Sequence, residues 1–259
     1  MWNSDTNFDY LNVVSVNKKA LIHSTCSKFK IPSKGVVLLF DRFDYKRYPK
    51  GSIWRCNLGL HLNIKIGYVN YRKSPKIIQK LIDSKAYIHL IWLPKRSWNS
   101  SEIDLVWNLS HELRHLDQDI KNRSITLAYY FLKYCFKCFD MDIEEDKIHT
   151  VLPPEKDAEL AAWRTVRERR LFGTQMADSY VHDNANKGTK KEIFRDLLKY
   201  DPNEEYDVST ETLSFLRKYQ KQFEYILNIG PDYYISEIGS IEDLCSKLSK
   251  KNLIILNSN

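Results

Sequence analysis

An amphipathic helix predicted from about Ser101 to Asp119 is the feature that most constrains how this chain of 259 residues folds. Leucines recur through it at a spacing that gathers side chains on one helical face, namely Leu105, Leu109, Leu113 and Leu116. Ser100 and Ser101 can cap its first turn, which is acidic. The segment from Tyr87 to Leu93 is a short apolar run typical of a buried strand. The sequence therefore predicts a strand followed by this helix.

The same helix contains His111-Glu112-Leu113-Arg114-His115, two histidines four residues apart with a glutamate after the first. Residues at this spacing lie on one helical face, so both imidazoles can reach one metal ion. Glu112 would act as general base toward a metal-activated water, while the metal polarises the scissile carbonyl. Arg114 would point away from the metal and pair with an acid. The pattern predicts half of a zinc peptidase site; the alternative is a partly exposed helix with two unrelated histidines.

A third metal ligand is expected beyond His115. A metzincin continuation would need glycine and histidine where Gln118 and Lys121 stand. Pro153 to about Phe172 is predicted to form a second helix, because proline at a helix start precedes good helix formers. One face of this helix combines two carboxylates with small residues, at Glu155, Ala158, Glu159 and Ala162. Its small residues would allow close approach to the histidine helix; solvated surface charges are the alternative.

Together, His111 to His115 and the Glu155-x-x-Ala158-Glu159 run resemble the gluzincin type of zincin metallopeptidase, in which the histidine motif is followed by a glutamate, two spacers, an alanine and an acidic residue. The resemblance implies that Glu155 is the third zinc ligand and that Ala158 packs against the metal helix. It also implies that Glu159 orients a ligand histidine by a hydrogen bond. Aspartate is usual at the last position, and the longer glutamate leaves Glu159 open as the ligand in place of Glu155.

A sheet before the metal helix also resembles the ImmA/IrrE-like intracellular peptidases, which cut repressors of mobile elements or stress responses. The segment between the two motifs is longer here than in that family, and it contains an aromatic and aliphatic stretch from Ser124 to Phe139. The resemblance therefore implies a divergent branch.

These observations predict a zinc-dependent intracellular endopeptidase that hydrolyses a peptide bond of a protein substrate. His149, Tyr180 and His182 flank the second motif helix and are candidate donors to the oxyanion. The alternative is a catalytically weak or inert zincin-fold module that binds nucleic acid or an acidic protein. Glu112 favours the peptidase, because a structural zinc site needs no general base.

Charge is divided unevenly along the chain. Residues 1–100 carry 18 Lys and Arg against 5 Asp and Glu, whereas the remainder carries 22 against 28. The basic half could face an acidic protein substrate or nucleic acid. Basic residues alternate there with aromatic ones that could stack on bases: Arg42, Phe43, Tyr45, Lys46, Arg47, Tyr48, Lys50, Trp54 and Arg55. Solvated sheet edges and core aromatics are the alternative.

The compartment is predicted to be the cytoplasm. The N-terminus lacks a basic stretch followed by an apolar run, and Ile125 to Phe139 is too short and too charged to span a membrane. Five scattered cysteines do not form a secreted disulfide framework: Cys26, Cys56, Cys135, Cys138 and Cys245. Reduced thiols are expected, with the Cys135–Cys138 pair inside a helix and packed in the core.

The predicted fold class is α+β, with a small antiparallel sheet packed beside the histidine helix and a mostly helical C-terminal half. Residues 1–180 would form the zincin-like metallopeptidase domain and residues 181–259 a helical extension. Strands are expected at 35–40, 54–71 and 87–93, with helices at 10–30, 75–84, 101–119, 125–139, 153–172, 190–200, 209–228 and 240–250. His61 and His89 fall in strand-like runs and are expected to be structural.

Overall fold

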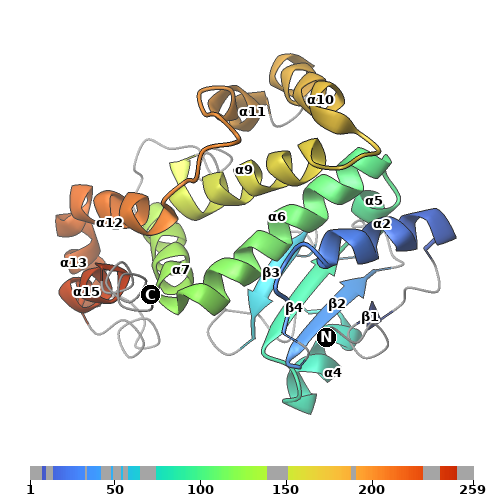
Figure 1. Ribbon diagram of the computed structural model, residues 1–259. Coiled ribbons are helices and arrows are strands. Elements are labelled where there is room, and N and C mark those ends of the chain that lie inside the picture. The colour runs from blue at the N-terminus through green and yellow to red at the C-terminus, as the bar shows by residue number, and fades with distance from the viewer. Residues whose placement is uncertain are drawn as a thin grey trace, which may run out of the picture. The chain divides into compact units, whose positions relative to one another are not determined.

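The computed structural model describes residues 8–9, 14–32, 34–41, 48, 54, 58–64, 74–138, 151–187, 191–229 and 240–249. These residues form a small mixed sheet and a helical half (Figure 1). Two compact units are present, Met1–Asp117 with Ala161–Ala177 and Gln118–Leu160 with Asp178–Asn259. Helices α6 (Glu102–Lys121), α9 (Pro153–Arg167) and α10 (Gly173–Lys187) each contribute residues to both units. The domain boundary predicted at residue 180 stays a prediction.

The sheet of the first unit has the strand order β1-β2-β4-β3, formed by Phe8–Asp9, Val36–Phe40, His89–Leu93 and Leu60–Asn63. Strand β2 pairs in parallel with β1 and β4, and only the edge strand β3 is antiparallel to its neighbour β4. The expectation of an antiparallel sheet was therefore wrong. Helix α2 (Val16–Cys26) lies between β1 and β2 in the chain, and such a crossover is what permits a parallel pair.

The two faces of this sheet pack on different cores, because successive side chains of a strand point to opposite sides. On one face, residues of β2 and β4 form a cluster with the four leucines predicted for the histidine helix: Val36, Leu38, Phe40, Ile91, Leu93, Leu105, Leu109, Leu113 and Leu116. On the other face, Leu39 and Trp92 pack with Ile78 of helix α4 (Lys76–Ser84). The predicted apolar stripe thus covers one face of the sheet.

Helix α6 begins as its sequence predicts. The Ser101 Oγ accepts a hydrogen bond from the Asp104 backbone N–H at 3.2 Å and donates to Asp104 Oδ2 at 2.6 Å. Before it, the short helix α5 (Lys95–Trp98) was not expected from the sequence. The Lys18 Nζ of α2 donates to the carbonyls of Trp98 and Ser100, which fixes the entry to α6.

The second unit is helical. Its core joins α7 (Arg123–Cys138), α12 (Val208–Lys218), α13 (Gln220–Ile229) and α15 (Ile241–Ser249), with α11 (Lys191–Leu197) also in this unit. Its largest buried rings include Phe131 and Phe223, whose centroids lie 5.4 Å apart.

The helix expected at 10–30 is shorter, at Val16–Cys26, and two other predicted helices differ from the observed ones in kind. The single helix expected at 209–228 is wrong, because the chain divides into α12 and α13 at Tyr219, where φ is −113° and ψ is 22°. Tyr219 leaves the helical conformation while its ring packs between Phe215 and Phe223. The second motif helix ends at Arg167 rather than near Phe172, and α10, which was not expected, starts at Gly173 with a φ of 68°.

The structure also bears on the thiols. Cys26 and Cys245 are free, and Cys135 and Cys138 lie in α7 as expected, whereas Cys56 lies outside the described residues. Within the part of the chain that is described, no helix combines the length and the mean hydropathy needed to cross a membrane.

The packing of α6 predicts a large effect of truncating its leucine stripe. Leu109→Ala should lower the free energy of unfolding by about 2–5 kcal/mol, because the side chain is fully buried and its loss leaves a cavity. Ile120→Ala on the same helix is the control: its side chain is 43% exposed, and its loss should cost less than about 1 kcal/mol. Urea unfolding measures both, and equal losses would contradict the packing described.

Candidate metal centre

His111 and His115 lie on consecutive turns of α6, one face of which they share. Their Nε2 atoms are 3.2 Å apart and their rings meet at 81° with centroids 4.8 Å apart. Two nitrogen ligands of a tetrahedral zinc ion, each about 2.0–2.1 Å from the metal, lie about 3.3 Å from each other. The separation of the two imidazoles therefore fits a shared divalent ion.

Viewed along the axis of α6, Glu112 lies between the face that carries the leucine stripe and the face that carries the two histidines. Its side chain is only 7% exposed. Its carboxylate lies against the backbone of Gly59, the residue before β3. A Cβ added to Gly59 would lie 2.6 Å from Glu112 Oε1 and 2.8 Å from its Cγ, closer than real Cβ contacts allow. A larger residue at position 59 would force the Glu112 side chain to shift. The geometry thus holds a buried proton acceptor next to the two imidazoles of the same helix.

Glu155 lies in the first turn of α9 and is held by α7. Its Oε1 accepts a hydrogen bond from Tyr129 Oη at 2.5 Å, and the Lys133 Nζ donates to the same Tyr129 Oη at 2.9 Å. Glu155 is 5% exposed, so this hydrogen bond supports a carboxylate that has lost most of its water.

Gln118 ties the last turn of α6 to the first turn of α9. Its Nε2 donates to the Pro154 carbonyl at 2.9 Å and to Asp157 Oδ2 at 2.7 Å. Gln118 follows His115 by about one helical turn, so this contact limits movement of the turn that comes after the second histidine. Ligand atoms of His111, His115 and Glu155 all lie within 4.8 Å of one another, so this group could hold a metal ion. Glu159 is buried but is not a member of this group.

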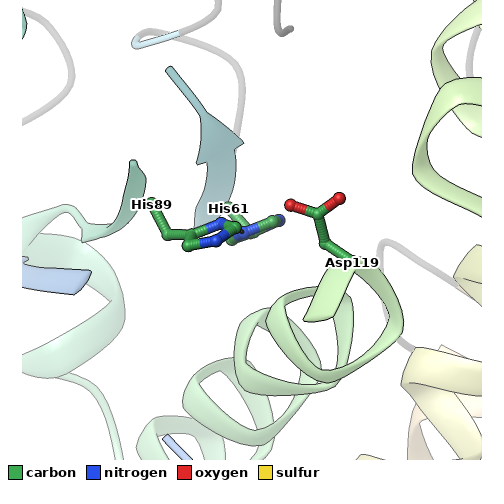
Figure 2. Close-up of side chains that lie close together, drawn as sticks. All are labelled: His61, His89 and Asp119. Atoms are coloured by element: carbon green, nitrogen blue, oxygen red, sulfur yellow. Dashed lines mark hydrogen bonds between the residues drawn. The ribbon is translucent and has the colours of Figure 1, made fainter. Parts of the chain in front are cut away.

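A second group could also hold a metal ion, and it consists of His61, His89 and Asp119, whose ligand atoms likewise lie within 4.8 Å of one another. Figure 2 shows the two rings, which come from β3 and β4, and the carboxylate at the end of α6. From the sequence, both histidines were expected to be structural, and Asp119 was not expected to bind a metal. One sequence feature could have pointed to this group: Asp119 lies four residues beyond His115 and so on the next turn of the same helix.

Other predicted residues have simpler surroundings. Arg114 pairs with Asp117 at 2.5 Å on the same helix, which confirms that it binds an acid. On α10, the ring of Tyr180 packs edge-on against Phe194 and His182 is exposed. His149 lies outside the described residues.

The basic aromatic segment is described only at two aromatic positions. Tyr48 and Trp54 are both buried, and their rings contact Trp92. These two rings are therefore core residues in the structure rather than surfaces for stacking bases. The remaining residues proposed to contact nucleic acid lie outside the described residues: Arg42, Phe43, Tyr45, Lys46, Arg47, Lys50 and Arg55.

No family model, curated protein or solved structure matches the chain. The motif residues and the geometry around them are therefore the evidence for function.

Lys156, between Glu155 and Asp157, anchors α9 to α11. Its Nζ lies 2.9 Å from Asp196 Oδ2 and donates to Tyr200 Oη at 2.7 Å. Burial opposes the charge of Lys156, but the hydrogen bonds with Tyr200 and Asp196 outweigh it and raise the pKa of the amine. Burial likewise opposes ionisation of Asp196, yet the hydrogen bonds from Lys156 and Lys199 lower the pKa of its carboxyl group.

This ion pair predicts a pH-dependent contribution to stability. Because the pKa of Asp196 is depressed in the folded protein, its contribution is present above the usual value of 3.8 and is lost as pH falls through the lower folded value. Asp196→Asn should lower the free energy of unfolding by about 1 kcal/mol near neutral pH, and the difference should shrink in acid. Glu192→Gln, at an exposed carboxyl of the same helix, should show no such difference. A deficit independent of pH would contradict this account.

Proposed function

We propose that the protein is a zinc-dependent endopeptidase that hydrolyses a peptide bond of a protein substrate. The observation that carries this proposal is the pair of imidazole nitrogens 3.2 Å apart on α6, with the buried Glu112 carboxylate between them in sequence. Two histidines alone would also suit a structural ion. Hydrolysis additionally requires a general base, and Glu112, which follows the first histidine and lies against Gly59, could supply it.

His111, His115 and Glu155 are the proposed ligands, and their donor atoms suit zinc, which takes histidine and carboxylate ligands in tetrahedral sites. When bound, zinc would supply Lewis acidity toward the scissile carbonyl and toward a water molecule. The hydrogen bond from Tyr129 fixes one oxygen of Glu155 and orients the other. Glu159 is the alternative ligand, and exchange of each glutamate for glutamine would decide between them by metal content.

Glu112 is the proposed general base. It would accept a proton from the attacking water and return that proton to the leaving amine. Glu112 follows His111 directly on α6, so its carboxylate would lie close to a water molecule held beside the two imidazoles. Its fixed position against Gly59 also reduces the conformational freedom lost on reaching the reactive arrangement.

Glu112→Gln tests the proposal. The variant should keep its metal content and its free energy of unfolding, since glutamine has the same shape, while cleavage of a peptide library, read by mass spectrometry, should fall by about 10²–10⁴-fold or more. Glu102→Gln in the first turn of the same helix is the control and should cleave normally. Undiminished cleavage by the Glu112 variant would refute the assigned role. If neither the variants nor the wild type cleave any peptide, the result would support the alternative, an inert binding module.

Gly59→Ala tests the position of Glu112 rather than its chemistry. The added methyl group has to displace the Glu112 side chain, so cleavage should fall at least about tenfold while the metal content stays the same. In a double-mutant cycle, Gly59→Ala should have no further effect on cleavage once Glu112 is glutamine. A normal rate in the Gly59 variant would mean that the observed contact is unimportant for the reaction.

A further inference from the structure

Polar residues occupy one end of a sheet face that is otherwise apolar. The register pairs Asn63 with His89 and His61 with Ile91 across β3 and β4, so His61, Asn63 and His89 share the face on which Ile91 and Leu93 pack against α6. His61 and Asn63 are 7% and 4% exposed, and His89 is half-buried. Buried polar side chains on an apolar face cost free energy unless they are hydrogen-bonded or bind an ion.

The two histidines of this group face each other. His61 Nε2 and His89 Nδ1 lie 3.4 Å apart, and the two rings are nearly parallel, with an interplanar angle of 20°. This separation is long for a hydrogen bond between ring nitrogens but close to the distance of about 3.3 Å between two nitrogen ligands of one tetrahedral ion. The distance between these two ring nitrogens, which come from two strands, is thus similar to the distance between the ring nitrogens of His111 and His115 on one helix.

A carboxylate completes the donor set. Asp119 lies on α6, one turn beyond Leu116, and Leu116 belongs to the cluster that packs on this same sheet face. Asp119, His61 and His89 lie close together (Figure 2), and one ligand atom from each lies within 4.8 Å of the other two. Asp119 is 5% exposed, and a charge with so little access to water is stabilised by a cation.

We propose that His61, His89 and Asp119 bind a second divalent transition-metal ion. Two imidazoles and one carboxylate form a donor set of intermediate softness, which suits zinc, cobalt, nickel or iron(II) better than magnesium or calcium. The ion would fasten the last turn of α6 to the edge strand β3 and its neighbour β4. This site does not depend on the proposed peptidase activity, because none of its ligands belongs to the His111, His115 and Glu155 group.

The experiment is zinc stoichiometry on the full-length protein. Wild type and variants are purified without chelators, equilibrated with excess zinc, desalted and measured by elemental analysis. His61→Gln and Asp119→Asn test the second site, and His115→Gln tests the first. His182→Gln, at an exposed histidine of α10, is the control for loss of an imidazole. Wild type and the control should carry about two zinc ions per chain, and each of the other variants about one.

The outcomes separate this proposal from the proposed function. One zinc ion in the wild type that is lost in His115→Gln but kept in His61→Gln overturns the second site and leaves the first intact. One ion lost in both variants also overturns it, because the residues would then share a single site. One ion lost in His61→Gln but kept in His115→Gln supports the second site and refutes the first.

A variant that fails to fold would not decide the stoichiometry, so a second measurement uses folded protein only. In the His115→Gln background, excess zinc should raise the melting temperature, because an ion that binds only the folded chain stabilises it. Cobalt in the same background should give the visible absorption of a tetrahedral site with nitrogen and oxygen ligands. No zinc-dependent shift and no cobalt absorption would overturn the proposal and leave His61 and His89 as a hydrogen-bonded pair.

Discussion

The packing of the α6 leucine stripe on the sheet determines where every candidate catalytic or metal-binding residue of that helix points. Since successive residues are rotated by about 100°, burying Leu109 and Leu113 against β2 and β4 leaves no freedom in the rotation of the helix about its axis. Glu112 is then held at the border of the apolar stripe, beside the start of β3. The two histidines lie on the adjoining flank, and Arg114 points away, where it pairs with Asp117.

A second constraint acts at the start of α9, where Glu155, Asp157 and Glu159 are all buried within little more than one helical turn. Three carboxylates at such close spacing repel one another and lose hydration, so each needs a compensating partner. Asp157 accepts from Gln118, and Glu155 accepts from Tyr129, beside which Lys133 brings a positive charge. A divalent ion at Glu155 would further offset this charge, which gives the proposed metal a role in stability as well as in hydrolysis.

The sequence predicted local structure well and long-range structure poorly, for physical reasons. The leucine spacing, the Ser101 cap and Pro153 each act within a few residues, and α6 and α9 begin where these signals put them. The direction of strand pairing depends on the path of the intervening chain, so a parallel sheet was not foreseen. The pairing of His61 with His89 likewise depends on the register of β3 against β4, which neither strand specifies alone. Similarly, the break at Tyr219 follows from tertiary packing of its ring.

The two candidate metal groups share helix α6, but their proposed roles differ. The proposed general base, Glu112, follows His111 directly in the sequence, and it is not a member of the His61, His89 and Asp119 group. An ion at Asp119 is therefore proposed to stabilise the fold. It would hold the end of α6 to β3, while Gln118, one residue earlier, ties the same turn to the start of α9. The Gln118 contact limits movement of the turn that follows His115, and the proposed ion would limit it further.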